Sequence, residues 1–523
     1  MRLAVAAILV ALMVGGCGKP VREPTTLVIS QLGEAANIDP AAFVHAGDLT
    51  IIAETYQRLI RQEFSAGVPT GEFEGELAES WKVSDDHLTY VFRLKPDQYF
   101  SDGTNVDARA VKWSFERIIA TNRAAAQYLT WIDAITVADR HTVRIRAKEP
   151  FPAALTALAY SSSVVMNPAS ASAHETEGEL GRWLSTNSAG SGPYQVDSWR
   201  RGEKLVLTAN THYGGEPPFF RRVIIKTVSD PSARRIQLRK RDVDFVQTVA
   251  STNAHYYSDL DGIRLHSFET ENQPGIWILN TRHPVVGDVR VRQAIAYGVD
   301  YDGLIDDVLD GRASRLTALM PEGVIGRVED VLPYRHAPDH ARRLLADAGY
   351  PDGAELDLMI GLVGPVSETM QSFMADIGIR LNLEIVAAAS FYDRIAAGDF
   401  AIAYSGAYFD FLDPWAILRP WYHSQSITRG TNYSCYSNPD VDRLLETADS
   451  AFDPDLRARA YRRAQQIIAE DTPYILLFSG NVIFATLDDI RGIDVKPLLP
   501  YRLGIHSMYR IGEHEQASVR GAH

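Results

Sequence analysis

In the second half of the chain, the spacing of apolar residues alternates between the pattern of a strand and the pattern of a helix. Apolar residues predict strands over 355–360, 381–385 and 400–404. Between these strands, one helical apolar face ends at Gly378 and a shorter one ends at Gly398. The resulting β-α-β-α-β order is typical of a parallel sheet covered by helices.

The first half carries the same two signals. Strict alternation over 88–94 predicts a half-buried strand, and Asp107 then caps a predicted helix. Two further strands are predicted on either side of Arg201-Gly202-Glu203, and the apolar run 223–228 suits a covered strand. With 523 residues, the chain exceeds what one hydrophobic core usually covers, so we expect two or three lobes.

The first twenty residues, MRLAVAAILVALMVGGCGKP, have the pattern of a lipoprotein signal. Arg2 precedes an apolar run that is too short to span a bilayer, and small residues then precede Cys17. We expect cleavage before Cys17, which would carry the lipid; the alternative is a short uncleaved anchor. Residues 1–16 would then be the signal peptide and residues 17–24 a tether. The mature body is expected in the periplasm or on the outer cell surface, held to the membrane through the lipid anchor alone.

Composition and charge narrow the class of partner. The chain is 46% hydrophobic and 23% charged, as in a folded protein, and its formal net charge is −14. This charge argues against nucleic acid or an anionic membrane surface as a partner. Of the two cysteines, Cys435 is left alone if Cys17 is lipidated, so no structural disulfide is expected and the exported body must rely on a large core.

Catalytic and metal-binding signatures are not found in the sequence. It contains no Gly-x-Ser-x-Gly elbow and no phosphate loop. His336 and His340 are four residues apart, as metal ligands on a helix can be, but Pro338 lies between them and Asp339 has the pattern of a helix cap. We therefore expect a helix start there, no metal or cofactor, and no enzymatic activity.

The stretch GAYFDFLDPW places an aspartate among aromatic residues. Asp410 lies between Phe409 and Phe411, just past the strand predicted over 400–404. Ionised carboxylates avoid dry surroundings unless a partner is present, and ligands of open α/β sheets bind outside the carboxyl ends of strands. The spacing alone leaves two readings open: Asp410 holds the positive charge of a ligand, or it forms a buried ion pair with an arginine of the protein.

The residues that follow permit more than one interpretation. Asp413 precedes a proline, which indicates turn geometry. Trp415, Trp421 and Tyr422 could line a ligand pocket, although aromatic residues near a loop more often belong to the core.

Five blocks of the sequence resemble a known family. ELAESWKVSDDHLTYVFRLKPDQYFSDGTNVDARAVKWSFERI (76–118) is similar to the signature block of extracellular solute-binding proteins of family 5, the dipeptide/oligopeptide class that serves ATP-driven (ABC) importers. The other four blocks match in order: NIDPA, GSGPYQVDSWRRGEKLVLTAN, NTRHPVVGDVRVRQAIAYGVDYDGLI and GTNYSCYSNPDVDRLLETA.

The resemblance implies an α/β fold of the type II periplasmic-binding-protein kind, with two lobes and an extra domain inserted in the first lobe. Lobe I would comprise residues 25–55, 180–272 and 490–515, the inserted domain 56–179, and lobe II 273–489. Crossings near Gln273 and Ile490 would form the hinge. The lobes would enclose the ligand and contact each other mainly through it.

The resemblance also implies a binding site. In peptide-binding members an aspartate in an Asp-x-x-Asp/Glu-Pro run pairs with the amino terminus of the peptide, and DFLDP puts Asp410 at that position. The edge around Val44, His45 and Ala46 corresponds to backbone that pairs with the ligand. The remaining ligand-binding candidates are Tyr408, Trp415 and Asn432.

Two departures from the family pattern bear on the cargo. Dipeptide-specific relatives have an arginine where this chain reads GLVGPVSE, and Ala407 replaces a common tryptophan. Peptides not restricted to dipeptides are therefore expected, carried by a monomer to the permease subunits of an ABC importer. The alternatives are a non-peptide cargo, such as a nickel chelate, haem, an oligosaccharide or an opine, or a sensor that transports nothing.

Overall fold

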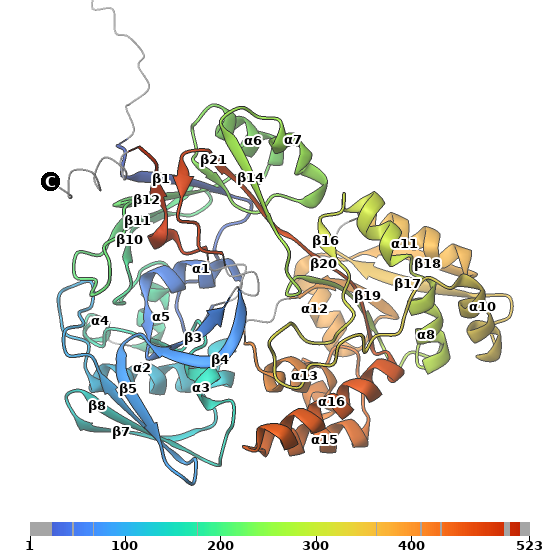
Figure 1. Ribbon diagram of the computed structural model, residues 1–523, viewed down its shortest axis with the longest axis horizontal. Coiled ribbons are helices and arrows are strands. Elements are labelled where there is room, and N and C mark those ends of the chain that lie inside the picture. Colours follow the sequence, from blue (N-terminus) through green and yellow to red (C-terminus); the bar gives the residue numbers. More distant parts are fainter. Residues whose placement is uncertain are drawn as a thin grey trace, which may run out of the picture.

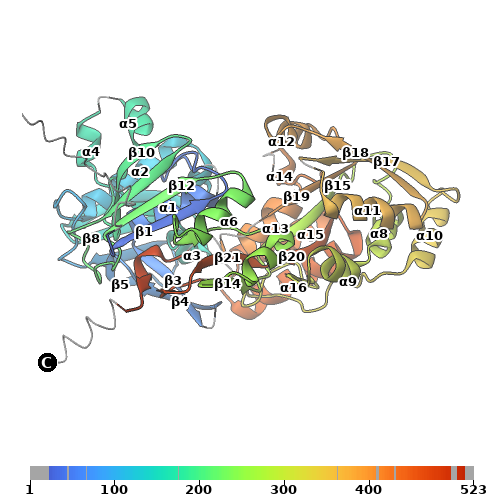
Figure 2. The same ribbon diagram turned by 90° about the horizontal axis from the view of Figure 1, so that it is seen from above.

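The computed structural model describes residues 23–43, 46–65, 67–174, 176–361, 363–407, 411–428, 431–495 and 503–512. Two lobes lie side by side, and the views in Figure 1 and Figure 2 agree on this arrangement. The expected α/β architecture with two lobes and an inserted domain is confirmed. None of the helices in the described ranges is both long and apolar enough to cross a membrane.

The first lobe is built on a seven-stranded sheet of order β10-β11-β12-β1-β13-β21-β14. Its central strand β1 pairs in parallel with β12 and β13, and the outer strands pair antiparallel. The predicted strands on either side of Arg201-Gly202-Glu203 are confirmed as β10 and β11. The strands are β1 (Thr26–Gln31), β10 (Tyr194–Arg200), β11 (Lys204–Ala209), β12 (Arg222–Thr227), β13 (Phe245–Val246), β14 (Ile263–Phe268) and β21 (Val482–Leu487).

The second lobe is built on a six-stranded sheet of order β16-β20-β15-β19-β17-β18. The predicted β-α-β-α-β unit is confirmed as β17-α11-β18-α12-β19, in which β17 pairs in parallel with both β18 and β19. The strands are β15 (Pro274–Leu279), β16 (Ala313–Ser314), β17 (Ala354–Ile360), β18 (Ile379–Ile385), β19 (Ile402–Gly406) and β20 (Tyr474–Gly480); the two helices are α11 (Pro365–Asp376) and α12 (Ala388–Ala397).

The return crossing between the lobes lies earlier than the sequence predicts. The expected position near Ile490 leaves β21 in the second lobe, but β21 pairs with β13 and β14 of the first sheet. The chain therefore returns between β20 and β21. Both strands are apolar along almost their whole length, so either sheet could accept them, and only the pairing partners decide.

The inserted domain lies between α1 (Ala46–Thr55) and β10 and contains a four-stranded sheet of order β5-β6-β8-β7. Helix α2 (Ala108–Thr121) packs on this sheet, and Asp107 caps it as predicted by accepting hydrogen bonds from the backbone of Arg109 and Ala110, both at 3.0 Å. The strands are β5 (Ala78–Val83), β6 (Thr89–Leu94), β7 (Ile132–Asp139) and β8 (Thr142–Ala147), with a separate hairpin of β3 (Ile60–Ser65) and β4 (Val68–Gly75).

Three helices of the second lobe face the inserted domain (Figure 1). They are α13 (Pro414–Tyr422), α15 (Pro439–Ser450) and α16 (Pro454–Asp471), and α15 packs against both of the others. One hydrophobic cluster runs through the first lobe and the inserted domain and continues into these helices. A second cluster lies within the second lobe, around α8 (Val289–Gly298) and α11. The apolar core is therefore continuous across the boundary between the lobes.

One of the remaining helices tests a prediction. The helix predicted to start near His336 and His340 is confirmed as α10, but its N-cap is Ala337 and Asp339 lies in its first turn, so the predicted cap is wrong by two residues. These helices are α3 (Ala154–Leu158), α4 (Ala169–Ser172), α5 (Glu177–Leu184), α6 (Pro231–Arg239), α7 (His255–Ser258), α9 (Tyr301–Gly303), α10 (Pro338–Asp347) and α14 (Gln425–Thr428).

Candidate functional site

The predicted anchor Asp410 lies in the sequence between strand β19 and the buried residues Phe411 and Leu412. Strand β19 ends at Gly406, and the Ala407 amide donates to the Pro274 carbonyl at 3.1 Å. Phe411 and Leu412 are buried where the description resumes. Tyr408 and Asp410 lie outside the described residues, so their roles stay predictions.

The same holds for most of the other candidates near the N-terminus. Cys17, Val44 and His45 also lie outside the described residues. Ala46 is the first residue of α1, and only its backbone is described. The predicted backbone edge therefore immediately precedes α1, and its role stays a prediction.

Asp413 fixes the start of α13. Its Oδ1 accepts a hydrogen bond from the backbone of Trp415 at 2.9 Å and an ion-pair contact from Arg457 at 2.7 Å. Burial by itself lowers the pKa of the Arg457 guanidinium, but the Asp413 carboxylate more than offsets this and the pKa is raised. Asp413 is thus the N-cap of α13, in agreement with the turn geometry predicted from the proline that follows it, and it forms a buried ion pair with Arg457. Both readings of Asp410 stay predictions, because Asp410 lies outside the described residues.

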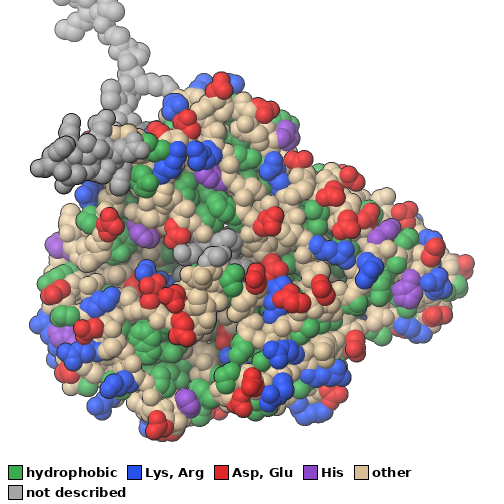
Figure 3. All heavy atoms as spheres, in the orientation of Figure 1, with side chains coloured by type: hydrophobic (Ala, Val, Ile, Leu, Met, Phe, Trp, Pro, Cys, Tyr) green, Lys and Arg blue, Asp and Glu red, His purple; other side chains and the backbone are tan. Residues whose placement is uncertain are grey.

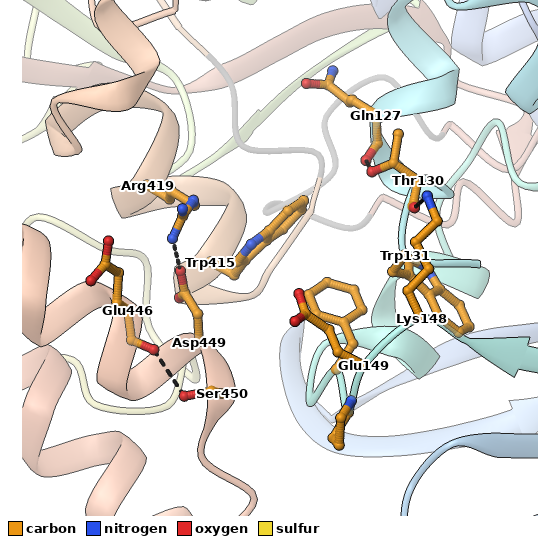
Figure 4. Close-up of a pocket in the computed structure, with 12 residues that line it drawn as sticks. Gln127, Thr130, Trp131, Lys148, Glu149, Trp415, Arg419, Glu446, Asp449 and Ser450 are labelled. Carbon is orange, nitrogen blue, oxygen red and sulfur yellow. Dashed lines mark hydrogen bonds and ion pairs between the residues drawn. The ribbon is translucent and has the colours of Figure 1, made fainter. Parts of the chain in front are cut away.

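A pocket of about 520 Å³ lies between the inserted domain and the second lobe (Figure 4). The two sides come from loops around β7 and β8 and from helices α13 and α15. The inserted domain contributes Gln127, Thr130, Trp131, Lys148, Glu149, Pro150 and Phe151, and the second lobe contributes Trp415, Arg419, Glu446, Asp449 and Ser450. Because both sides are needed to enclose it, the pocket exists only when the lobes are together.

Aromatic rings form the inner wall of this pocket. The rings of Trp131 and Phe151 are 5.8 Å apart, and Phe151 meets Trp415 across the lobe boundary at 5.1 Å in an edge-to-face arrangement. The Trp131 Nε1 donates to the Tyr128 carbonyl at 3.0 Å, which satisfies its polar end inside the wall. The structure thus places Trp415, a predicted ligand contact, at a pocket wall.

A fixed ion pair lies on the second-lobe side of the pocket. Arg419 Nη1 donates to Asp449 Oδ2 at 2.7 Å, and Arg419 Nη2 donates to the Gln425 side chain at 3.3 Å. The Tyr461 hydroxyl donates to the other Asp449 oxygen at 2.6 Å. Burial raises the pKa of Asp449 even though these donors oppose the shift. Both groups are therefore held in place before any ligand arrives.

The lobes also contact each other directly. The Tyr128 and Phe411 rings stack at 5.4 Å with 13° between their planes, and Tyr160 lies 6.1 Å from Phe411. At another point His87 of the inserted domain stacks on Phe452 of the second lobe at 3.7 Å and 13°. The expectation that the lobes meet mainly through the cargo is therefore wrong, because aromatic pairs already join them.

A second cavity, of about 380 Å³, belongs to the first lobe and the inserted domain. It lies between α1, the β3–β4 hairpin and residues 503–506. Several of its carboxylates have partners: Glu76 pairs with Arg58 at 2.8 Å, and Glu54 approaches His506 at 3.2 Å. The described residues that line this cavity include none from the second lobe, so closing the lobes would not enclose a ligand there, and the pocket between the lobes is the better candidate.

Comparison with known proteins identifies the family. The model of "Bacterial extracellular solute-binding proteins, family 5 Middle" matches residues 72–429. The chain is 31% identical over 92% of its length, and 94% of the other chain, to "Probable D,D-dipeptide-binding periplasmic protein DdpA" of Escherichia coli (strain K12). This chain is a family 5 extracellular solute-binding protein. The resemblance noted in the sequence is thereby confirmed.

Solved structures agree with the fold of this solute-binding protein. A periplasmic binding protein DppA from Helicobacter pylori, solved with the peptide STSA, matches with a TM-score of 0.79 at 23% identity over 93% of this chain and 98% of that one. NikZ from Campylobacter jejuni, solved with Ni(L-His), matches equally well, with a TM-score of 0.79 at 21% identity over 94% and 100%. Proteins with unlike cargoes therefore share this architecture.

The side chain of Asn432 in this solute-binding protein makes its hydrogen bonds within its own loop. Its Nδ2 donates to the carbonyls of His423 at 3.2 Å and Tyr436 at 2.8 Å, and its Oδ1 accepts from the Ser434 hydroxyl at 3.0 Å. The side chain is 2% exposed. It touches a small cavity of about 110 Å³ that also includes Cys435, so its ligand-binding role stays a prediction.

Several pocket residues had no distinguishing signal in the sequence. Trp415 and Arg419 share one face of α13 because they are four residues apart, and Glu446, Asp449 and Ser450 share a face of α15 for the same reason. That spacing could have suggested a common surface, although not its partner. By contrast, Tyr422 is buried against Tyr436 and Tyr474, so the core interpretation is confirmed for Tyr422.

Proposed function

We propose that this protein is a lipid-anchored receptor that captures peptides between its lobes and delivers them to an ABC importer. The observation that carries the proposal is the pocket between the lobes, in a chain that is 31% identical to the probable D,D-dipeptide-binding periplasmic protein DdpA. The lipid on Cys17 would keep the receptor at the membrane, near the permease subunits of the importer.

Asp410 is the proposed anchor for the amino terminus of the peptide. Enclosing an ammonium group is costly by several kcal/mol unless an opposite charge meets it. The Asp410 carboxylate, four positions after the end of β19 in the sequence, would meet this need and would not discriminate between peptide side chains. The backbone at Val44, His45 and Ala46 would pair with the peptide backbone, which also ignores side-chain identity.

Calorimetry with free and amino-terminally acetylated peptides tests the anchor. Asp410→Asn keeps the shape and removes the charge, which typically costs about 2–5 kcal/mol and therefore at least tens-fold in affinity. Acetylation should weaken binding to the wild type and should weaken it far less in Asp410→Asn. Asp352→Asn, an exposed carboxylate on a turn of the second lobe, is the control and should bind like the wild type. Equal binding of free and acetylated peptides by the wild type would refute the anchor.

The length and handedness of the cargo can be tested in the same assay. The absence of an arginine from GLVGPVSE suggests that peptides longer than two residues are accepted. Titration with D-Ala-D-Ala, L-Ala-L-Ala, tri-alanine and penta-alanine covers both length and configuration. A marked preference for one dipeptide would show that another cation, such as Lys148 or Arg419 of the pocket, binds the carboxylate.

A non-peptide cargo is the second candidate, because the structural likeness to NikZ shows that this architecture also holds a metal chelate. Native mass spectrometry of protein purified from cells separates the two candidates. A bound mass that fragments as a peptide supports the first, and a metal chelate, sugar or opine mass supports the second. A sensor without transport would bind the same cargo, but deletion of the receptor would leave uptake of labelled peptide unchanged.

A further inference from the structure

Glu149 is an exposed glutamate that lines the pocket, and no ion-pair partner is described for its carboxylate. It follows β8, and its carboxylate points across the pocket toward the second lobe (Figure 4). Within the described ranges, no lysine, arginine or histidine lies at ion-pair distance from it. Its neighbour Lys148 is directed elsewhere, since the Lys148 ammonium donates to the Thr130 carbonyl at 2.6 Å.

The other cation of the pocket is also engaged. Arg419 has one end of its guanidinium on Asp449 and the other on Gln425. The pocket is lined by two cations, Lys148 and Arg419, and three carboxylates, Glu149, Glu446 and Asp449, so the formal charge of its lining is −1. Acidic side chains also lie on both sides of the lobe boundary on the face shown in Figure 3.

The pocket wall suits a flat or compact cation. The rings of Trp415 and Phe151 line the cavity and meet edge to face; Phe151 is buried and Trp415 is half-buried. Aromatic faces attract guanidinium and ammonium groups, and a guanidinium can stack on a ring while its edge donates to a carboxylate. A neutral apolar side chain would use the rings but would make no charge pair with Glu149, whose exposed carboxylate would stay hydrated.

We infer that this pocket receives a cationic side chain of the peptide cargo, arginine before lysine, and that Glu149 is the residue that selects it. The inference rests on the proposed peptide-binding function and names a substrate class for it. When the lobes close, Glu149 approaches from the inserted domain and Trp415 from the second lobe, so the cation would be held by both at once. Selection would therefore depend on the closed state.

The test uses the full-length chain and matched tripeptides. Tri-alanine is compared with three peptides that carry arginine at the first, second or third position, and with counterparts in which citrulline replaces arginine. Citrulline has nearly the same shape as arginine but no charge. Affinities are measured by calorimetry for the wild type, for Glu149→Gln and for Glu216→Gln. Glu216 is an exposed glutamate on the loop between β11 and β12, far along the chain from the pocket, and serves as the matched control.

At least one arginine peptide should bind the wild type roughly five- to tenfold more tightly than its citrulline counterpart, the range expected for a partly hydrated charge pair with an aromatic contact. This ratio should fall to about one in Glu149→Gln and persist in Glu216→Gln. Equal affinities of arginine and citrulline peptides at all three positions would overturn the inference while leaving peptide binding intact. A ratio that survives in Glu149→Gln would also overturn it. Failure of tri-alanine and every other peptide to bind would refute the proposed function itself, and the inference with it.

Discussion

The buried pair of Asp413 and Arg457 should contribute strongly to the stability of the second lobe. Their side chains are 7% and 10% exposed, and Oδ1 of Asp413 lies 2.7 Å from Nη2 of Arg457. Asp413→Asn keeps the helix cap, because asparagine caps as well as aspartate, but leaves the guanidinium buried and uncompensated. Conversely, Arg457→Met leaves the Asp413 carboxylate buried without the positive charge that compensates it. Each change should lower the free energy of unfolding by about 3–5 kcal/mol.

The double variant separates this pair from ordinary packing. In Asp413→Asn/Arg457→Met no buried charge is left without a partner, so the loss should be smaller than the sum of the two single losses by at least about 2 kcal/mol. Urea denaturation, followed by tryptophan fluorescence, gives the three values from the shifts of the midpoint. Arg462→Met, at an exposed position of the same helix α16, should change stability by less than about 0.5 kcal/mol. Additive losses in the double variant would refute the reasoning.

Three further predictions concern a contact between the lobes, the pair of His506 with Glu54, and the lipid anchor. His87→Ala removes an aromatic stack on Phe452, typically about 0.5–1.5 kcal/mol, so the cargo-free variant should have a larger radius of gyration in small-angle scattering; an unchanged radius would contradict this. Burial lowers the pKa of His506, but the Glu54 carboxylate more than offsets this and raises the pKa above 6.5. The pair therefore stabilises the fold fully below pH 6.5, and this stabilisation is lost as the pH rises through the pKa of His506 in the folded protein. The excess stability of the wild type over His506→Gln should accordingly fade above pH 6.5, and a difference independent of pH would count against the pairing. Cys17→Ala should move the protein from the membrane fraction to the soluble fraction, and retention in the membrane would argue against lipidation.

The local elements were predictable because their signals are local. The unit β17-α11-β18-α12-β19 follows from apolar periods that alternate between two and 3.6 residues, with Gly378 and Gly398 after the two helices. Asp107 caps α2 through its own neighbours. In such cases the backbone geometry depends on residues within one or two turns. The family could be identified as well, because five blocks in a fixed order are specific even when each alone is weak.

The failed predictions depend on distant partners. β21 was assigned to the second lobe because nothing in an apolar strand indicates which sheet it joins; its pairing with β13 and β14 decides that. The buried pair of Asp413 with Arg457 was not predicted, because the two residues lie 44 positions apart and no local pattern connects them.

The sequence by itself therefore determined the order of strands and helices, the family, and the position of the DFLDP run after a parallel strand. Only the tertiary structure decided which side chains share the pocket. Glu149 and Phe151 follow a strand of the inserted domain, whereas Trp415 and Asp449 lie on two helices of the other lobe. No period or motif connects segments so far apart in the chain. They meet because the hydrophobic cluster that includes Phe411 and Tyr160 continues across the lobe boundary, and packing of that kind depends on the whole fold.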